Sequence, residues 1–265
     1  MDKLRFISLS SSSNGNCYYL GNSMCGILID AGIHLRTVRK RLRDVGVELE
    51  QIYAVFVTHD HYDHIKAISA LGEKHNVPIY TTAKIHEGIN NCPGMKKKLS
   101  VQYQRIIENG ETIETGEFRV TSFPLPHDSA GNSGYVVNYR DKTFTFATDL
   151  GCPTDTLRGY IAQSDYLMLE ANYDEDMLEK GAYPVFLKRR VASDTGHLSN
   201  RAASELLADC ATDRLSHLFL GHLSKENNTP NLVLETLSQA VRSNTEIVVL
   251  PRTMPTQLFE FFDKR

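Results

Sequence analysis

The sequence predicts an α/β protein in which mixed β-sheets carry helices on their outer faces. Two observations favour this class. Short apolar runs such as 54–57 (Ala-Val-Phe-Val) have the pattern of strands that are covered on both faces. Both halves of the chain also contain several strand-like segments together with helical ones. We expect one domain spanning residues 1–265, because no low-complexity linker and no internal repeat divides the chain.

The composition is that of an ordinary globular protein, with 41% hydrophobic and 23% charged residues in a chain of 265. The net charge of -3 argues against a broadly basic nucleic-acid-binding surface, although a nuclease that holds phosphate through metal ions and a few local cations remains compatible with it. Five scattered cysteines without Cys-x-x-Cys spacing argue against a disulfide framework. With no signal-peptide pattern and no apolar run of membrane-spanning length, we expect a cytoplasmic protein and no membrane partner.

In the first half, the pattern predicts three strands, then helices alternating with two strands, then four strands in succession. The strands are expected at 4–9, 17–20, 26–30, 54–57, 78–80, 112–113, 118–123, 134–139 and 143–147, and the helices at 35–45, from about 63 onward, and at 82–90. The serine-rich segment 10–16 is expected to be a tight polar loop, which is either a flexible connector or a set of hydroxyl and N–H groups near an anion. The loop 91–98 carries three lysines at 96–98, which are typical of a solvated surface but can also meet a nucleic-acid backbone.

In the second half, strands are expected at 166–170, 217–220 and 247–250, and helices at 174–179, 200–211 and 231–241. Parallel strands joined through helices would account for this alternation.

The segment 59–64 (His-Asp-His-Tyr-Asp-His) directly follows the apolar run 54–57 and carries the strongest functional signal. A pair of histidines alone is more typical of hydrogen-bonded structural residues. Three imidazoles and a carboxylate within six residues are costly to crowd together unless a cation compensates. His59 and His61 can converge on one ion, and Asp63 and His64 follow at the start of a helix, so the segment predicts a metal site.

Three later strands end in further residues of ligand type. His127 follows the strand that ends near Leu125, Asp149 follows the strand 143–147, and His222 follows the strand 217–220. Ligands at the same end of successive strands come together in one cleft. We therefore expect all three side chains to join the cluster at 59–64.

The His-x-His-x-Asp-His string resembles the signature of the metallo-beta-lactamase superfamily, and this resemblance implies a four-layer αββα sandwich. By matching motifs, one metal ion would be held by His59, His61 and His127, a second by Asp63, His64 and His222, and Asp149 would bridge them. The two divalent ions, zinc or manganese, would share a water and lower its pKa. Asp30 lies where the superfamily has an acid that orients a ligand histidine, although it could instead cap the helix that follows.

Glu170 and His197 resemble the paired motifs of the tRNA 3′-processing endonucleases in this superfamily. The resemblance implies that His197 is the general acid that protonates the leaving oxygen and that Glu170 orients it. The alternative is that the segment around His197 only precedes a surface helix that Ser199 caps.

Over nearly its whole length the chain is similar to the YycJ/WalJ family, most specifically in the segments 188–190, 196–200 and 221–228. This family is regarded as cytoplasmic 5′-to-3′ exonucleases acting on DNA. The resemblance implies a two-metal phosphodiesterase with DNA, more than RNA, as its partner, a metal-bound hydroxide as nucleophile and Asp63 helping to position it. The implied phosphate contacts are Lys188, Arg189, Arg190, Ser199 and Asn200, whose alternative is ordinary surface polarity.

Other functions fit the same sequence less well. A small-molecule hydrolase acting on a thioester, a lactone or a cyclic phosphodiester could use the same metal cleft but would need a closed pocket, whereas a nuclease needs an open groove. A non-catalytic nucleic-acid-binding module is disfavoured by the intact set of ligand-type residues. A flavodiiron redox role is disfavoured because that branch has Glu in place of the second His of the motif and carries a flavin domain for which the chain has no room.

Overall fold

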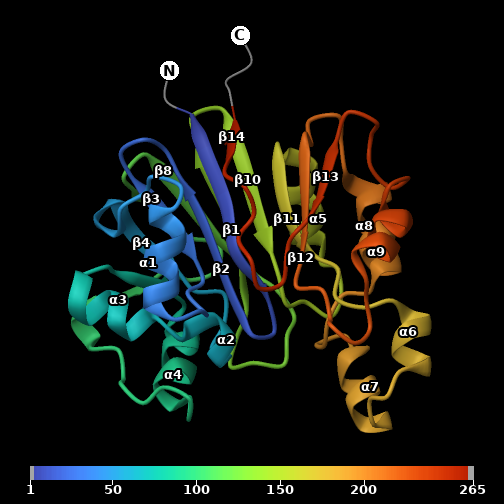
Figure 1. Ribbon diagram of the computed structural model, residues 1–265, viewed down its shortest axis with the longest axis horizontal. Helices are drawn as coiled ribbons and strands as arrows, with labels where there is room; N and C mark the ends of the chain where they lie inside the picture. Colours follow the sequence, from blue (N-terminus) through green and yellow to red (C-terminus); the bar gives the residue numbers. More distant parts are fainter. Residues whose placement is uncertain (1–2, 262–265) are drawn as a thin grey trace.

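The structure is a computed structural model that describes residues 3–261. Two seven-stranded sheets lie face to face, with helices on both outer sides (Figure 1). This arrangement is the four-layer αββα sandwich that the sequence predicted.

The first sheet has the strand order β14-β1-β2-β3-β4-β5-β6. Its strands are β1 (Leu4–Ser12), β2 (Gly15–Gly21), β3 (Gly26–Ile29), β4 (Ile52–Phe56), β5 (Ile79–Thr81), β6 (Gln104–Ile106) and β14 (Phe259–Phe261). The strands from β14 to β3 pair antiparallel, and those from β3 to β6 pair parallel. The C-terminal strand β14 therefore returns to the sheet of the N-terminal half, which the sequence did not predict.

The second sheet has the order β13-β12-β11-β10-β9-β8-β7. Its strands are β7 (Thr112–Thr115), β8 (Phe118–Pro124), β9 (Ser133–Tyr139), β10 (Lys142–Ala147), β11 (Tyr166–Glu170), β12 (His217–Gly221) and β13 (Glu246–Val249). It too is antiparallel on one side, from β7 to β10, and parallel on the other, from β10 to β13.

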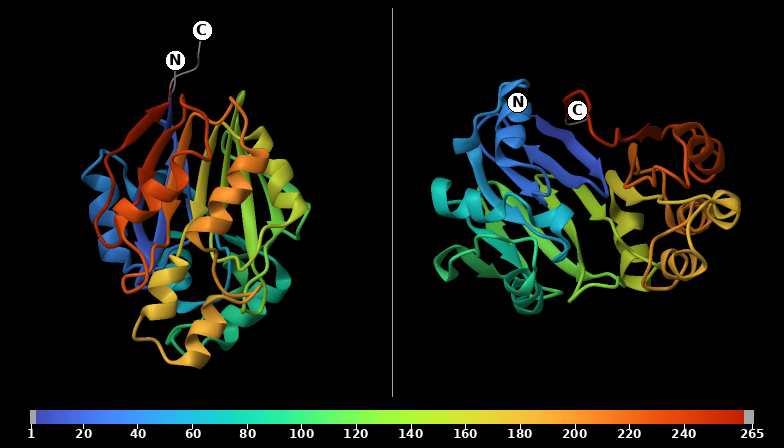
Figure 2. Two further views of the ribbon diagram at one scale, coloured as in Figure 1. Left: turned by 90° about the vertical axis from the view of Figure 1, so that its right-hand side faces the viewer. Right: turned by 60° about the horizontal axis from the view of Figure 1, so that its bottom comes forward.

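The helices cover the outer face of each sheet. On the first sheet they are α1 (Leu35–Arg43), α2 (Tyr62–Ile65), α3 (Ile68–His75) and α4 (Ala83–Asn91), with short 3-10 turns η1 (Leu49–Gln51) and η2 (Val101–Tyr103). On the second they are α5 (Asp155–Gln163), α8 (Asn200–Cys210) and α9 (Pro230–Leu237). Two further helices, α6 (Glu175–Lys180) and α7 (Val185–Val191), lie between β11 and α8 in the chain. Figure 2 shows α8 and α9, in orange and red-orange, on the outer face of the second sheet, and α6 and α7 beyond its edge.

Three buried apolar clusters separate the four layers. The cluster between the sheets is rich in aromatic rings, with Phe6, Phe144 and Phe219 packed at centroid distances of 4.5 to 5.8 Å. The other two clusters lie between each sheet and its helices and are mainly aliphatic. Burial of these side chains on both faces of the strands explains why their sequences read as apolar runs.

Several boundaries differ from the prediction. The serine-rich segment is not a loop from 10 to 16, because β1 runs to Ser12, β2 begins at Gly15 and only residues 13–14 form the hairpin turn. The helix expected from about residue 63 is two helices, α2 and α3. The helices α1 and α9 end at Arg43 and Leu237, earlier than predicted, and α5, α7 and β6 were not predicted.

No helix in residues 3–261 is both long enough and apolar enough to span a membrane. The loops that carry the predicted ligands follow β4, β8, β10 and β12, and they meet at one edge of the sandwich, the edge where α2 lies in Figure 1.

Candidate metal centre

The histidine loop, residues 59–64, leaves the end of β4 and turns into α2. It is held close to the turn after β3, where a Cβ on Gly32 would lie 1.5 Å from the carbonyl oxygen of Asp63. Backbone hydrogen bonds fix this approach, since the N–H of Ala31 donates to the carbonyl of His64 at 2.8 Å. A residue without a side chain at position 32 is therefore required for the loop to reach its place.

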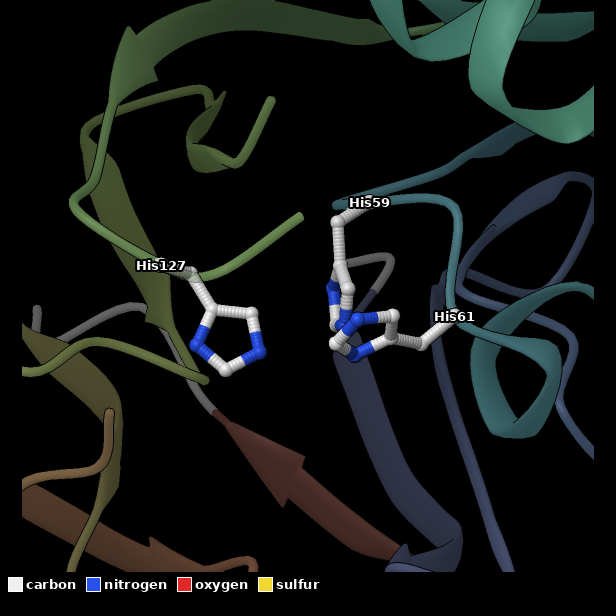
Figure 3. A group of neighbouring side chains, drawn as sticks. All are labelled: His59, His61 and His127. Atoms are coloured by element: carbon white, nitrogen blue, oxygen red, sulfur yellow. The ribbon is translucent and has the colours of Figure 1, made fainter. Parts of the chain in front are cut away.

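His59, His61 and His127 face one another although His127 comes from the other sheet (Figure 3). Their ring centroids lie 4.6 to 5.1 Å apart, and they offer nitrogen atoms within 4.8 Å of one another. This spacing lets three imidazoles bind one cation.

The other predicted ligands form a second group beside the first. Asp63, His64 and His222 offer ligand atoms within 4.8 Å of one another, and Asp149 forms a further such group with His59 and His64. Asp149 thus offers a ligand atom close to residues of both sets. Asp149 and His222 adopt left-handed backbone, with φ of 54° and 55°, as does Asp30 with φ of 58°. Such strain in a non-glycine residue, on the order of 1 kcal/mol or more, is typical of functional sites.

In the four buried histidines of the site, His59, His64, His127 and His222, the nitrogen Nδ1 is bound by a neighbouring group. His64 donates to Asp30 at 2.7 Å, and His59 pairs at 3.0 Å with the hydroxyl of Thr58, which itself donates to Asp30. Asp30 is therefore hydrogen-bonded to a histidine of the site and does not cap α1, whose N-cap residue is His34. His127 Nδ1 donates to the carbonyl of Gly196 at 3.0 Å, and His222 Nδ1 donates to Glu170 at 2.8 Å.

Because Nδ1 of these histidines is occupied, Nε2 is the ring nitrogen that can bind a metal ion. Nε2 of His59, His127 and His222 is buried and has no hydrogen-bond partner among the described residues. An imidazole whose Nδ1 carries the proton presents a lone pair at Nε2, the form that binds metal. Three orphaned lone pairs converging beside carboxylates fit divalent cations, because without one each would be a costly buried acceptor.

The electrostatics of the site differ from ligand to ligand, since nearby carboxylates, against the effect of burial, raise the pKa of His64 to about 10 and also raise that of His222. Burial, and then the neighbouring His64, holds the pKa of His59 well below its usual value, so this imidazole stays neutral. Burial alone would raise the pKa of Asp149, but the surrounding histidines, His222 first, hold it well below the usual value. A neutral imidazole and an ionised carboxylate are the protonation states that metal binding needs.

Glu170 and His197 form a pair at the margin of this cluster. Nδ1 of His197 donates to Glu170 Oε1 at 2.7 Å, and the same oxygen accepts the bond from His222. Burial lowers the pKa of His197, but Glu170 above all raises it, and it stands at about 9. The side chain of His197 is 20% exposed, whereas Glu170 is fully buried. His197 can therefore present a proton to a bound molecule while Glu170 cannot.

Two of the predicted phosphate contacts, Ser199 and Asn200, use their side chains within the protein. Asn200 is fully buried and exchanges hydrogen bonds with Asn228, so its side chain is not accessible to a substrate and the prediction for it is wrong. Ser199 caps α8 by accepting from the N–H of Ala202, and its hydroxyl donates to Glu175. Both of its hydrogen-bonding functions are therefore used within the protein.

The basic residues of α7 lie beside the site. Arg190 pairs with Asp128, next to His127, at 2.5 Å. The ammonium group of Lys188 donates to the carbonyl of Glu179 at 2.5 Å, while Arg189 is exposed. Among these three, Arg189 is the cation that remains open to a substrate phosphate.

Asn16 and Thr58 belong to the site but were not singled out in the sequence. Asn16 is buried, and its amide nitrogen lies 2.9 Å from Nε2 of His64 and 3.3 Å from Asp63. The amide of Asn16 would therefore compete with a cation for Nε2 of His64. Thr58 could have been found from its place between β4 and His59, but Asn16 comes from a hairpin far along the chain and gives no such signal.

The fold and the site define the class of the protein, which is a metal-dependent hydrolase of the metallo-beta-lactamase fold. A solved structure of Zn(2+)-bound PqqB from Methylobacterium extorquens has the same fold, with a TM-score of 0.72 and 15% identity over 96% of this chain and 99% of that one. At this identity the similarity describes the fold alone.

Sequence relatives give the family. A family model described as Beta-lactamase superfamily domain matches residues 26–219. The chain is 34% identical over 233 residues to the exodeoxyribonuclease WalJ of Streptococcus pneumoniae serotype 2 (strain D39 / NCTC 7466), covering 88% of this chain and 86% of that protein. It is 31% identical over 238 residues to the exodeoxyribonuclease YycJ of Bacillus anthracis, covering 90% and 89%. The chain belongs to the beta-lactamase superfamily, in its WalJ/YycJ-like family, as the sequence predicted.

Proposed function

We propose that this protein is a two-metal phosphodiesterase that degrades DNA as a 5′-to-3′ exonuclease. The observation that carries the proposal is the Glu170–His197 pair, which adjoins two groups of ligand-type residues linked by Asp149. A phosphodiester leaving group needs a proton, and a protonated histidine beside the metal groups can provide it. The names of the relatives from Streptococcus pneumoniae and Bacillus anthracis support DNA as the substrate.

The ligand groups would hold two divalent cations, zinc or manganese, with His59, His61 and His127 on one, Asp63, His64 and His222 on the other, and Asp149 between them. When bound, the cations would lower the pKa of water and stabilise negative charge on the phosphoryl oxygens.

The residues of the chain would divide the remaining work. Asp63, whose side chain is 26% exposed, lies at the margin of the site and would accept a hydrogen bond from the attacking water. His197 would protonate the leaving oxygen through Nε2, because Glu170 holds Nδ1. Arg189 would meet the phosphate backbone next to the site.

The shape of the surface favours a polymer over a small molecule. The hollow beside His61 has a volume of about 510 Å³ and opens to solvent between the histidine loop and α4. An enzyme for thioesters, lactones or cyclic phosphodiesters would be expected to enclose its substrate. Of the predicted ligands His61 lines this hollow, so the hollow lies beside the ligand groups and would leave room for a strand that continues past them.

The test is degradation of oligonucleotides by the purified protein loaded with manganese or zinc. Single- and double-stranded DNA and RNA are supplied with 5′-phosphate or 5′-hydroxyl ends, and the products are resolved over time. We expect mononucleotides released from the 5′ end of DNA. If none of these substrates is degraded faster than by a His61→Ala control, the nuclease proposal is wrong.

A further inference from the structure

A basic hollow adjoins the candidate metal centre on the side of the first sheet. It has a volume of about 730 Å³ and is lined by the lysines Lys66, Lys74, Lys96, Lys97 and Lys98, together with residues of α3 and of the loop after α4. Within residues 3–261, none of these lysines forms an ion pair with a carboxylate. The acid that lines the hollow is Glu73, whose carboxylate accepts the N–H of Ser100. The positive charge is thus local in a chain whose net charge is -3.

The lysine loop, residues 96–98, is not a loose surface run. Met95 and Leu99 on either side are buried in the cluster beneath the first sheet, and the hydroxyl of Ser69 donates to the carbonyl of Lys97 at 2.6 Å. Three consecutive exposed ammonium groups are therefore held over the hollow against their mutual repulsion. Such an arrangement costs free energy in the absence of an anion and favours binding one.

Tyr62 connects this basic hollow with the hollow beside His61. Its side chain lines both, and it is the residue that directly follows His61 in the histidine loop. The ring packs against Gly94, where a Cβ would lie 2.6 Å from it, and Nζ of Lys66 lies 5.3 Å from the ring centroid. Even so, Tyr62 is 41% exposed. An exposed ring fixed from one side, next to an ammonium group, is suited to stacking with a nucleobase.

We infer that the two hollows form one binding groove for single-stranded DNA, in which Tyr62 stacks on a base and the lysines bind the phosphates of the strand beyond the metal centre. This inference rests on the proposed nuclease function and adds the path of the strand to it. Sequence-tolerant binding of a single strand uses this combination of an aromatic platform and a positive groove. The groove runs from His61 past Tyr62 to the lysine loop.

The experiment compares a long and a minimal substrate on the metal-loaded protein. The lysines at 96–98 are replaced together by Gln, and in a second variant Tyr62 is replaced by Ala. KM and kcat are measured for a single-stranded oligodeoxynucleotide and for bis(p-nitrophenyl) phosphate, which reaches only the metal centre. We expect KM for the oligonucleotide to rise about tenfold in each variant, and in the lysine variant, whose changes lie outside the histidine loop, the ratio of small-ester to oligonucleotide turnover should rise accordingly.

Matched controls separate the groove from general effects. Tyr62→Phe keeps the ring and should behave as the wild type. Replacement of the exposed cations Arg36, Lys40 and Arg43 of α1 by Gln removes the same charge from another face and should change KM much less. The lysine variant should also weaken the dependence of log KM on log salt by about 2, because three phosphate contacts are lost.

The outcomes distinguish this inference from the proposed function. If the wild type degrades DNA and the lysine variant matches the α1 variant in KM and salt dependence, the inferred groove is ruled out, while the proposed nuclease function is supported. If the wild type hydrolyses the small ester but no oligonucleotide, both are wrong. If the small ester is affected as strongly as the oligonucleotide, the residues support the metal centre and do not bind a strand.

Discussion

The two sides of the candidate metal centre hold their histidines in different ways. On the first sheet, His59, His61 and His64 come from six consecutive positions. His64 binds Asp30 directly, and His59 binds it through the hydroxyl of Thr58. On the second sheet, His197 and His222 come from distant parts of the chain and share one oxygen of Glu170. Each side thus has one buried carboxylate, but Asp30 supports two histidines of the ligand groups, whereas Glu170 supports His222 together with the partly exposed His197.

This difference has a chemical counterpart. Asp30 contacts a histidine that faces the ligand groups, so its effect should be confined to metal binding. Glu170 contacts one histidine of a ligand group and one that is suited to proton donation. A change in Glu170 should therefore disturb both metal binding and proton transfer.

The largest effect is expected where the two sides meet. Asp149 belongs to ligand groups on both sides, and Asp149→Ala should reduce phosphodiesterase activity to that of a protein-free blank. The physical reason is that two cations would face each other without the carboxylate between them. The measurements are hydrolysis of bis(p-nitrophenyl) phosphate and metal content per protein.

Circular dichroism serves as the control for the Asp149 variant, since an unfolded protein would also be inactive. A folded Asp149→Ala protein that retains full metal content and activity would show that the two sides do not cooperate through this residue.

The second largest effect is expected for His197, the proposed proton donor on the side of the second sheet. His197→Gln should lower kcat for DNA by about 10²- to 10⁴-fold, because the leaving oxygen loses its acid. Metal content is measured in parallel, because His197 also belongs to a ligand-type group with Asp149, Glu170 and His222, and an unchanged metal content assigns the loss to proton transfer. An ester with a p-nitrophenolate leaving group needs no proton, so its hydrolysis should be retained. Equal losses for both substrates would rule out the role of general acid.

The third effect compares the two supporting carboxylates directly. Asp30→Asn and Glu170→Gln should each weaken metal binding or activity by about 10- to 100-fold. Glu170→Gln should also make the rate depend more steeply on the leaving group, because it loosens His197, whereas Asp30→Asn should not. The measurement is a series of aryl phosphodiesters of increasing leaving-group pKa. The same slope in both variants would mean that the two sides are equivalent.

The same contrast between the two sides explains which parts of the candidate site could be predicted from the sequence. The histidine loop is contiguous and follows a recognisable buried strand, so its residues and the metal site could be predicted from pattern and chemistry. His127, Asp149 and His222 could be found because each ends a strand. The contact between Asn16 and His64 could not be predicted, because it forms only when β2 and β4 lie in the same sheet and bring distant parts of the chain together.

The burial of individual side chains and the shortest elements could not be predicted from the sequence. Asn200 is a polar residue in a family-specific segment, and only the structure shows it paired with Asn228 beneath the surface. The helix α7 was missed although its cations were noticed, because a short helix with exposed Val185 and Phe186 lacks an apolar face that repeats at helical spacing. The strand β14 was missed because three residues give too short a pattern.

The smallest effect concerns a histidine with no carboxylate partner, His86 in α4. It is buried and its Nε2 donates to the carbonyl of Arg105 at 3.0 Å. Burial lowers its pKa below the ordinary value of 6.5, in contrast to His197, whose pKa Glu170 raises. The unfolded chain therefore takes up the proton first as the pH falls, and this histidine makes the folded state less stable below about pH 6.5.

Replacement of His86 by Gln should remove that part of the pH dependence. Above pH 7 the imidazole is neutral in both states, so the difference in unfolding free energy between wild type and variant should be constant there. Below about pH 6.5 the difference should shift in favour of the variant, which has no proton to bind in the unfolded state. Urea unfolding at a series of pH values measures it. A difference that stays constant down to pH 5 would mean that His86 takes up a proton as readily in the folded protein as in the unfolded chain, and that a buried histidine here does not need a carboxylate to become charged.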